Sequence, residues 1–104
     1  MGVVVEMATP ALNRIPVKAA HTASQVIDGE AVVLDIPGKT LRGLNPVGSR
    51  IWELVDGTRT LTDIARVVAG EYARSESEVL RDVVIFLNEL AERRVIQFKN
   101  AENG

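Results

Sequence analysis

The sequence contains no cysteine. This absence excludes disulfide bonds, thiolate zinc sites and a cysteine nucleophile. It suits a reducing compartment, and we expect a cytoplasmic protein. Aromatic residues are also scarce, because the 104 residues include one Trp, one Tyr and two Phe. The hydrophobic core must therefore be built mainly from Val, Ile, Leu and Ala.

Long apolar runs and a strong charge of either sign are missing as well. No run approaches the length of about 20 residues that spans a bilayer. The N-terminus lacks a basic segment followed by an apolar one, so we expect no secretory signal. The net charge of −2 gives no electrostatic reason to expect nucleic acid or an anionic membrane as a partner.

Groups suited to catalysis are few. His21 is the single histidine, and the partner groups that general acid–base catalysis needs are not evident near it. No glycine-rich loop that opens a helix matches a phosphate-binding pattern. We therefore expect a protein without enzyme activity, without a cofactor and without a metal site.

What is present is the composition of one globular domain, with 46% apolar and 25% charged residues. Residues 1–17 contain two prolines and no sustained hydrophobic period, and we interpret them as a flexible N-terminal arm. Residues 18–98 form the predicted domain, and residues 99–104 are interpreted as a frayed tail.

The first half of the domain has the pattern of strands. Asp28-Gly29 tolerates the positive φ of a two-residue hairpin turn, and Pro37-Gly38 indicates the next turn. Gly43 is a candidate bulge, because Leu41 and Leu44 are out of phase around it. The predicted strands of an antiparallel meander are residues 24–27, 31–36 and 39–44.

Three helices are predicted downstream. Each begins at a residue that caps helices well, and Asp56-Gly57 is a stop signal between the first two. The predicted caps are Asn45 followed by Pro46, Thr60 with Asp63, and Ser75 with Glu78. The third helix has a wide apolar face, and Arg93 and Arg94 are expected in its last turn. Residues 95–98 are a candidate closing strand. The fold class is therefore α+β, similar to a winged helix-turn-helix.

A winged helix raises the alternative of a DNA-binding regulator. The outer face of the third helix is acidic except at its C-terminal end, so the cationic charge that dominates DNA affinity is missing. We therefore favour a protein that does not bind nucleic acid. Self-association as a homodimer through the wide apolar face is a further alternative.

Peptide binding fits the pattern better. The strand 39–44 is the last of the meander and leaves one sheet edge unpaired. An exposed edge accepts an extended peptide as an added strand, and the wide face of the third helix can line a groove beside it.

These motifs together resemble one known family. The segments 29–34, Leu44-Asn45 and 51–60, with the third-helix pattern Val79, Asp82-Val83, Phe86-Leu87, Leu90 and Val95-Ile96, are similar to the PqqD family over about residues 17–98. Members take part in pyrroloquinoline quinone biosynthesis, or serve as recognition elements for other ribosomally made, modified peptides.

The resemblance implies a non-catalytic peptide chaperone. Such a domain binds the leader of a precursor peptide as an added strand and presents it to a modifying enzyme, in the PqqD case a radical S-adenosylmethionine enzyme. It implies that Asp82 pairs with a basic leader residue and that the apolar helix residues receive aliphatic or aromatic ones. The implied peptide-binding residues are Lys39, Thr40, Leu41, Arg42, Gly43, Leu44, Val79, Asp82, Val83 and Phe86.

Overall fold

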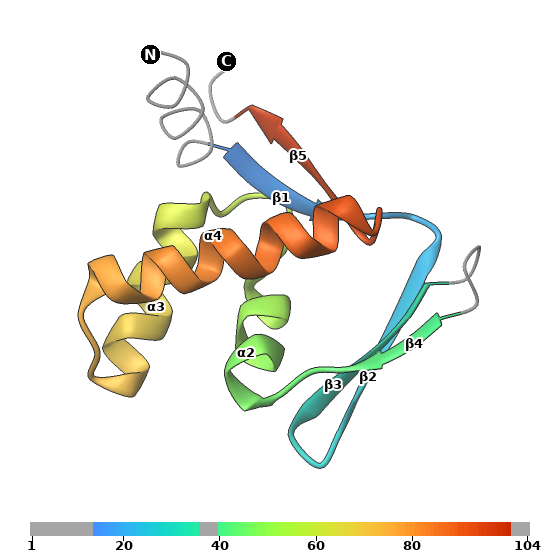
Figure 1. Ribbon diagram of the computed structural model, residues 1–104, viewed down its shortest axis with the longest axis horizontal. Coiled ribbons are helices and arrows are strands. Elements are labelled where there is room, and N and C mark those ends of the chain that lie inside the picture. The colour runs from blue at the N-terminus through green and yellow to red at the C-terminus, as the bar shows by residue number, and fades with distance from the viewer. Residues whose placement is uncertain (1–13, 36–39, 101–104) are drawn as a thin grey trace.

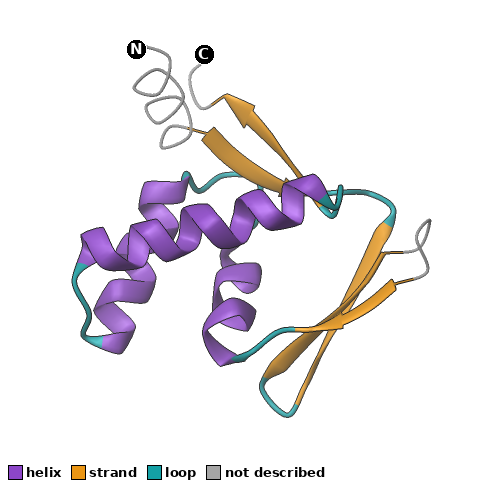
Figure 2. Cartoon of the chain, in the orientation of Figure 1, coloured by secondary structure: helices purple, strands orange, loops and turns teal. Residues whose placement is uncertain are grey.

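The computed structural model describes residues 14–35 and 40–100, and it contains two small antiparallel sheets and three helices (Figure 1). The elements are β1 (Arg14–Lys18), β2 (Thr22–Ile27), β3 (Glu30–Asp35), β4 (Thr40–Gly43), α2 (Pro46–Leu54), α3 (Leu61–Tyr72), α4 (Glu76–Glu92) and β5 (Ile96–Asn100). The predicted α+β class, with a meander followed by three helices, is confirmed. Figure 2 shows the meander at one end of the molecule and the helices beside it.

The meander has the strand order β2-β3-β4, so β4 is the end strand on one side. Asp28 and Gly29 have φ values of 55° and 80°, as the predicted hairpin turn requires. The predicted turn at Pro37-Gly38 lies outside the described residues. The register from Asp35↔Thr40 to Val32↔Gly43 is uninterrupted, so the expected bulge at Gly43 was wrong. Leu41 and Leu44 do not follow one strand alternation because the chain leaves the sheet after Gly43 and begins α2.

The second sheet pairs β1 with β5, from Arg14↔Asn100 to Lys18↔Ile96. Residues 14–17 therefore belong to a strand and not to the expected N-terminal arm, and β5 extends into the expected tail. This pairing joins segments from opposite ends of the sequence, which no local pattern reports. Pro16 is fully buried in β1, a position that an edge strand tolerates because it needs fewer N–H donors.

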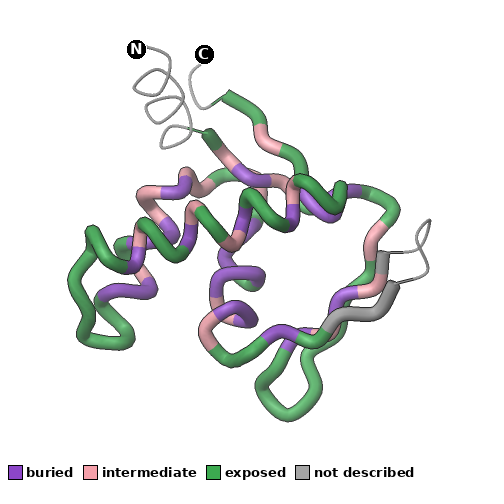
Figure 3. Tube along the Cα trace, in the orientation of Figure 1, coloured by how far each residue is buried: buried purple, intermediate pink, exposed green. Residues whose placement is uncertain are grey.

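The hydrophobic core lies between the helices and the inner face of the meander (Figure 3). It is mainly aliphatic, as the composition predicts, and Trp52 is the one aromatic residue among the described buried residues. Lys18 lies over that ring, with its ammonium 4.7 Å from the ring centroid, and burial lowers the pKa of Lys18. This contact joins β1 to α2. Tyr72 is the last residue of α3 and is 41% exposed, so it lies outside this core.

The helix caps agree with the sequence. The Asn45 side chain accepts the N–H of Gly48, and Thr60 and Asp63 form a reciprocal capping box. The C-terminus of α4 differs from the prediction, because the helix ends at Glu92 and Arg94 takes a left-handed φ of 63°. Arg93 and Arg94 therefore lie just beyond the last helical turn.

Candidate functional site

A groove of about 480 Å³ lies between the end of β4, helix α2 and helix α4. It is an open surface feature, and segments distant in the sequence form it. Its lining residues are Gly43, Leu44 and Asn45 after β4, Val47, Gly48 and Ile51 from α2, Arg74 before α4, and Asp82, Phe86 and Glu89 from α4.

The floor of the groove is apolar. Leu44 and Ile51 are buried, whereas Val47 and Phe86 are half-buried and pack against the core. Gly48 lets the ring of Phe86 approach α2 closely, because a Cβ at this glycine would lie 3.3 Å from Cζ of Phe86. The same Cβ would lie 3.2 Å from Oδ1 of Asn45, the atom that caps α2.

We expect Gly48→Ala to narrow this floor. The new methyl must displace the Phe86 ring or the Asn45 cap by a few tenths of an ångström, so any ligand seated on Phe86 should bind about threefold to tenfold more weakly, a loss of about 1 kcal/mol. Isothermal titration calorimetry measures the change in affinity.

Gly70→Ala in α3 is the matched control, since its Cβ would meet nothing within 4 Å. The control should bind normally and gain about 0.5–1 kcal/mol in stability. Equal binding by both variants would contradict this role of Gly48.

Ser49 fixes the position of the groove floor relative to the sheet. The amide of Leu44 donates to the carbonyl of Ala31 at 2.9 Å, as the next rung of the β3–β4 ladder would. The second bond of this pair, from the Ala31 amide to the Leu44 carbonyl, is replaced by a bridge through the Ser49 hydroxyl. Its Oγ accepts the N–H of Ala31 at 2.7 Å and donates to the carbonyl of Leu44 at 3.1 Å. Helix α2 is thus hydrogen-bonded to both strands at the point where the groove begins.

The outer edge of β4 adjoins the groove. In an antiparallel pair, successive residues direct their N–H and C=O alternately toward the partner strand and away from it. Since Leu44 faces β3, Arg42 and Thr40 also face β3, and Leu41 and Gly43 face outward. The described residues form no strand on this side of β4. The edge therefore offers the backbone groups of Leu41 and Gly43 for pairing.

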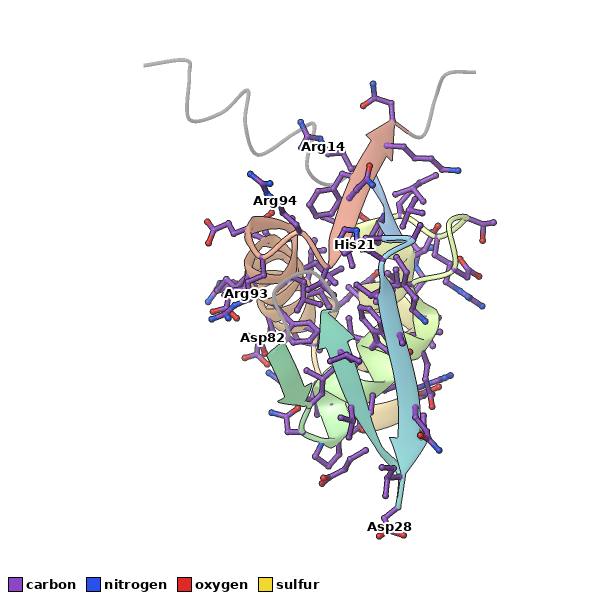
Figure 4. All side chains as sticks on the ribbon, turned by 90° about the vertical axis from the view of Figure 1, so that its right-hand side faces the viewer. Arg14, His21, Asp28, Asp82, Arg93 and Arg94 are labelled. Carbon is purple, nitrogen blue, oxygen red and sulfur yellow. The ribbon has the colours of Figure 1, made fainter. Side chains whose placement is uncertain are left out.

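Charged side chains border the groove along α4. Arg74 donates to Asp82 at 3.3 Å, and both side chains are about half exposed. Figure 4 shows Asp82 on the side of α4 next to β4. Together with Glu89, these groups surround an apolar floor with charges of both signs.

The structure brings together four of the predicted binding residues, namely Gly43, Leu44, Asp82 and Phe86. Two others are placed differently. Val79 and Val83 are 1% and 0% exposed, so they are core residues and do not line the groove. Both lie on the inner part of the wide apolar face, and periodicity alone does not separate the inner part from the rim.

The remaining predicted residues lie on the third strand. Residues 40–42 belong to β4, whose backbone makes the open edge, and Lys39 lies outside the described residues. Sequence reasoning missed six lining residues: Asn45, Val47, Gly48, Ile51, Arg74 and Glu89. The one sequence signal that could have indicated some of them is the start of α2 at Asn45-Pro46, which places this helix directly after the predicted strand.

The fold and the groove define a small α+β domain with an open sheet edge beside a helix. Residues 30–96 match the model of the family described as coenzyme PQQ synthesis protein D, and the chain belongs to this PqqD family. No curated protein matches the chain in sequence.

Three solved structures are similar to the chain. TbiB1, solved in complex with the TbiA(beta) leader peptide, is 32% identical with a TM-score of 0.73, over 78% of this chain and 94% of that one. Lasso peptide synthetase B1, complexed with a leader peptide, is 18% identical with a TM-score of 0.71, over 79% and 96%. The PqqD part of PqqCD from Methylobacterium extorquens, described as a stand-alone RiPP recognition element, is 22% identical with a TM-score of 0.67, over 80% and 88%.

Proposed function

We propose that this protein binds the leader of a ribosomally made precursor peptide as an additional strand beside β4. The observation that carries the proposal is the unpaired outer edge of β4, which adjoins at Gly43 a groove with an apolar floor between α2 and α4. Membership of the PqqD family supports it, as does the likeness to TbiB1, which was solved with a leader peptide.

Each part of the groove has a distinct role in this proposal. The N–H and C=O groups of Leu41 and Gly43 supply backbone hydrogen bonds, which give affinity for any extended chain. The floor at Phe86 receives an apolar leader side chain, and this contact gives selectivity. Asp82 pairs with a basic leader residue in exchange for its exposed bond to Arg74, which costs little because exposed ion pairs contribute about 0–1 kcal/mol.

The bound leader would position the rest of the precursor for a modifying enzyme, for which we propose a radical S-adenosylmethionine enzyme or another peptide-modifying enzyme. The protein itself would act without catalysis, in the cytoplasm. The described helices include none that is long and apolar enough to cross a membrane. The described part of the chain also holds no group of three or more His, Cys, Asp or Glu suited to a metal ion.

Backbone amide NMR tests this function. The ligand is a synthetic leader corresponding to a short reading frame next to the gene, titrated into the full chain. We expect chemical-shift changes at Gly43, Leu44 and Phe86, while Ser24 and Val26 on the opposite edge of the meander stay unchanged. Saturating peptide without shifts along β4 and α4 would rule out strand addition there. Retardation of duplex DNA at low salt would instead favour the winged-helix regulator.

A further inference from the structure

Helix α4 presents charges in a fixed order along the groove. Asp82, Phe86, Glu89 and Arg93 are spaced by four, three and four residues, so they share one face of the helix. In Figure 4, Asp82 lies between α4 and β4 and Arg93 projects sideways from α4, whereas Arg94 projects upward, away from β4. The stripe thus begins with a carboxylate, has an aromatic ring near its middle and ends with a guanidinium.

Arg93 has no carboxylate partner. Among the described residues, Arg50, Arg59, Arg66 and Arg74 each form an ion pair with a carboxylate, whereas Arg81, Arg93 and Arg94 form none. Of the last three, Arg93 is the one that follows Asp82, Phe86 and Glu89 in the helical spacing. Its position is well defined, because it caps α4 and its N–H donates to the carbonyl of Glu89 at 3.2 Å. An exposed guanidinium without an ion pair, four residues beyond the lining residue Glu89, is suited to a carboxylate ligand.

The direction of the sheet determines which end of a bound peptide meets Arg93. All strand pairs in the described fold are antiparallel, and a peptide antiparallel to β4 would enter beside Gly43 and leave beside Thr40. Figure 1 shows that α4 and β4 run in opposite general directions. The peptide would therefore run in the same direction as α4, with its C-terminal part toward Arg93.

Helix and strand geometry then give the spacing between the peptide residue at Phe86 and the peptide residue at Arg93. Phe86 and Arg93 are seven residues apart, which is roughly 10 Å along a helix at 1.5 Å per residue. An extended chain rises about 3.3 Å per residue, so this length corresponds to about three peptide residues.

We infer that Arg93 selects leader peptides with an Asp or Glu about three residues C-terminal to the apolar residue seated on Phe86. The inference rests on the proposed function, and it names the class of peptide that the groove takes: an extended segment with an apolar anchor followed by a carboxylate. The selection is electrostatic and partly exposed, so we expect a preference of about threefold to tenfold for carboxylate over amide at that position.

Selection from displayed random 12-residue peptides tests the inference on the full chain. The selections use the wild type, Arg93→Glu and a matched control, Arg94→Glu. The control makes the same change in net charge at the adjacent residue, whose side chain projects away from β4. We expect an acidic residue to be enriched about three positions after an apolar one with the wild type and with Arg94→Glu. With the Arg93→Glu variant, we expect Lys or Arg to be enriched at that position in place of the acidic residue. Melting temperatures within a few degrees of the wild type show that the exposed substitutions leave the fold intact.

The outcomes separate this inference from the proposed function. If enriched peptides bind, lose binding with Leu41→Pro, but show the same residue preferences with Arg93→Glu as with the wild type, the role of Arg93 is wrong and strand addition stands. If no peptide is enriched, or the enriched peptides bind Leu41→Pro equally well, the proposed function itself fails.

Discussion

Replacing Leu41 by proline is expected to weaken leader-peptide binding by at least about tenfold while the helices remain folded. Proline removes the N–H of residue 41, which faces outward from β4 and would donate to the added strand. The β3–β4 ladder should survive, because Arg42 and Thr40 supply its bonds. Proline is tolerated in an edge strand when its missing N–H faces away from the sheet. Calorimetric titration with the leader peptide measures the loss, and far-UV circular dichroism monitors the helices.

The opposite edge of the same sheet provides the control. Val26 on β2 pairs with Ala31, whose N–H and C=O are bonded to Ser49 and Leu44 on the other side. Val26 therefore also directs its backbone groups outward, and Val26→Pro makes the same chemical change at the edge remote from the groove. It should bind peptide as the wild type does. Normal binding by Leu41→Pro, or an equal loss in both variants, would contradict strand addition at β4.

Ser49→Ala is expected to destabilise the protein by about 1–3 kcal/mol, the cost of leaving a buried backbone group without its partner. Ser49 is 3% exposed, and its hydroxyl replaces a direct bond between the Ala31 amide and the Leu44 carbonyl. Without it, either these groups stay unpaired or the strands close together and shift Leu44 from α2. Thermal unfolding followed by Trp52 fluorescence should show a midpoint lower by roughly 4–8 °C for each kcal/mol.

Ser24→Ala is the matched control for this change, since Ser24 is an exposed residue of β2 in the same sheet. It should alter the free energy of unfolding by no more than about 0.5 kcal/mol. We also expect Ser49→Ala to weaken peptide binding, because Leu44 lines the groove. A midpoint equal to that of Ser24→Ala would mean that water replaces the hydroxyl, and that Ser49 does not hold α2 to the sheet.

Most local elements could be predicted from the sequence because their signals are local. Asn45, Thr60 and Ser75 cap helices through bonds to residues three positions later, and Asp28-Gly29 permits its turn by backbone conformation alone. The β1–β5 pair could not be predicted in this way, since its strands come from opposite ends of the sequence. The 41% exposure of Tyr72 likewise depends on which neighbours α3 acquires in the fold.

The candidate site was predictable only in outline. The open edge followed from the order of the strands, and Asp82 and Phe86 followed from the resemblance of α4 to the family pattern. Val79 and Val83 share that helix, yet the packing of α4 on α3 buries them. A helical period defines an apolar face, but the neighbouring elements decide how much of that face they cover.

The sequence by itself determined the meander, the three helices, the fold class and the family, because caps, turns and hydrophobic periods act over a few residues. The tertiary structure alone decided which residues form the groove. Gly48 lets Phe86 reach α2, and Ser49 joins that helix to β3 and Leu44. The opposite directions of α4 and β4 determine which end of an added strand would lie toward Arg93. These contacts join residues distant along the chain, so they exist only after the sheet and the helices have packed together.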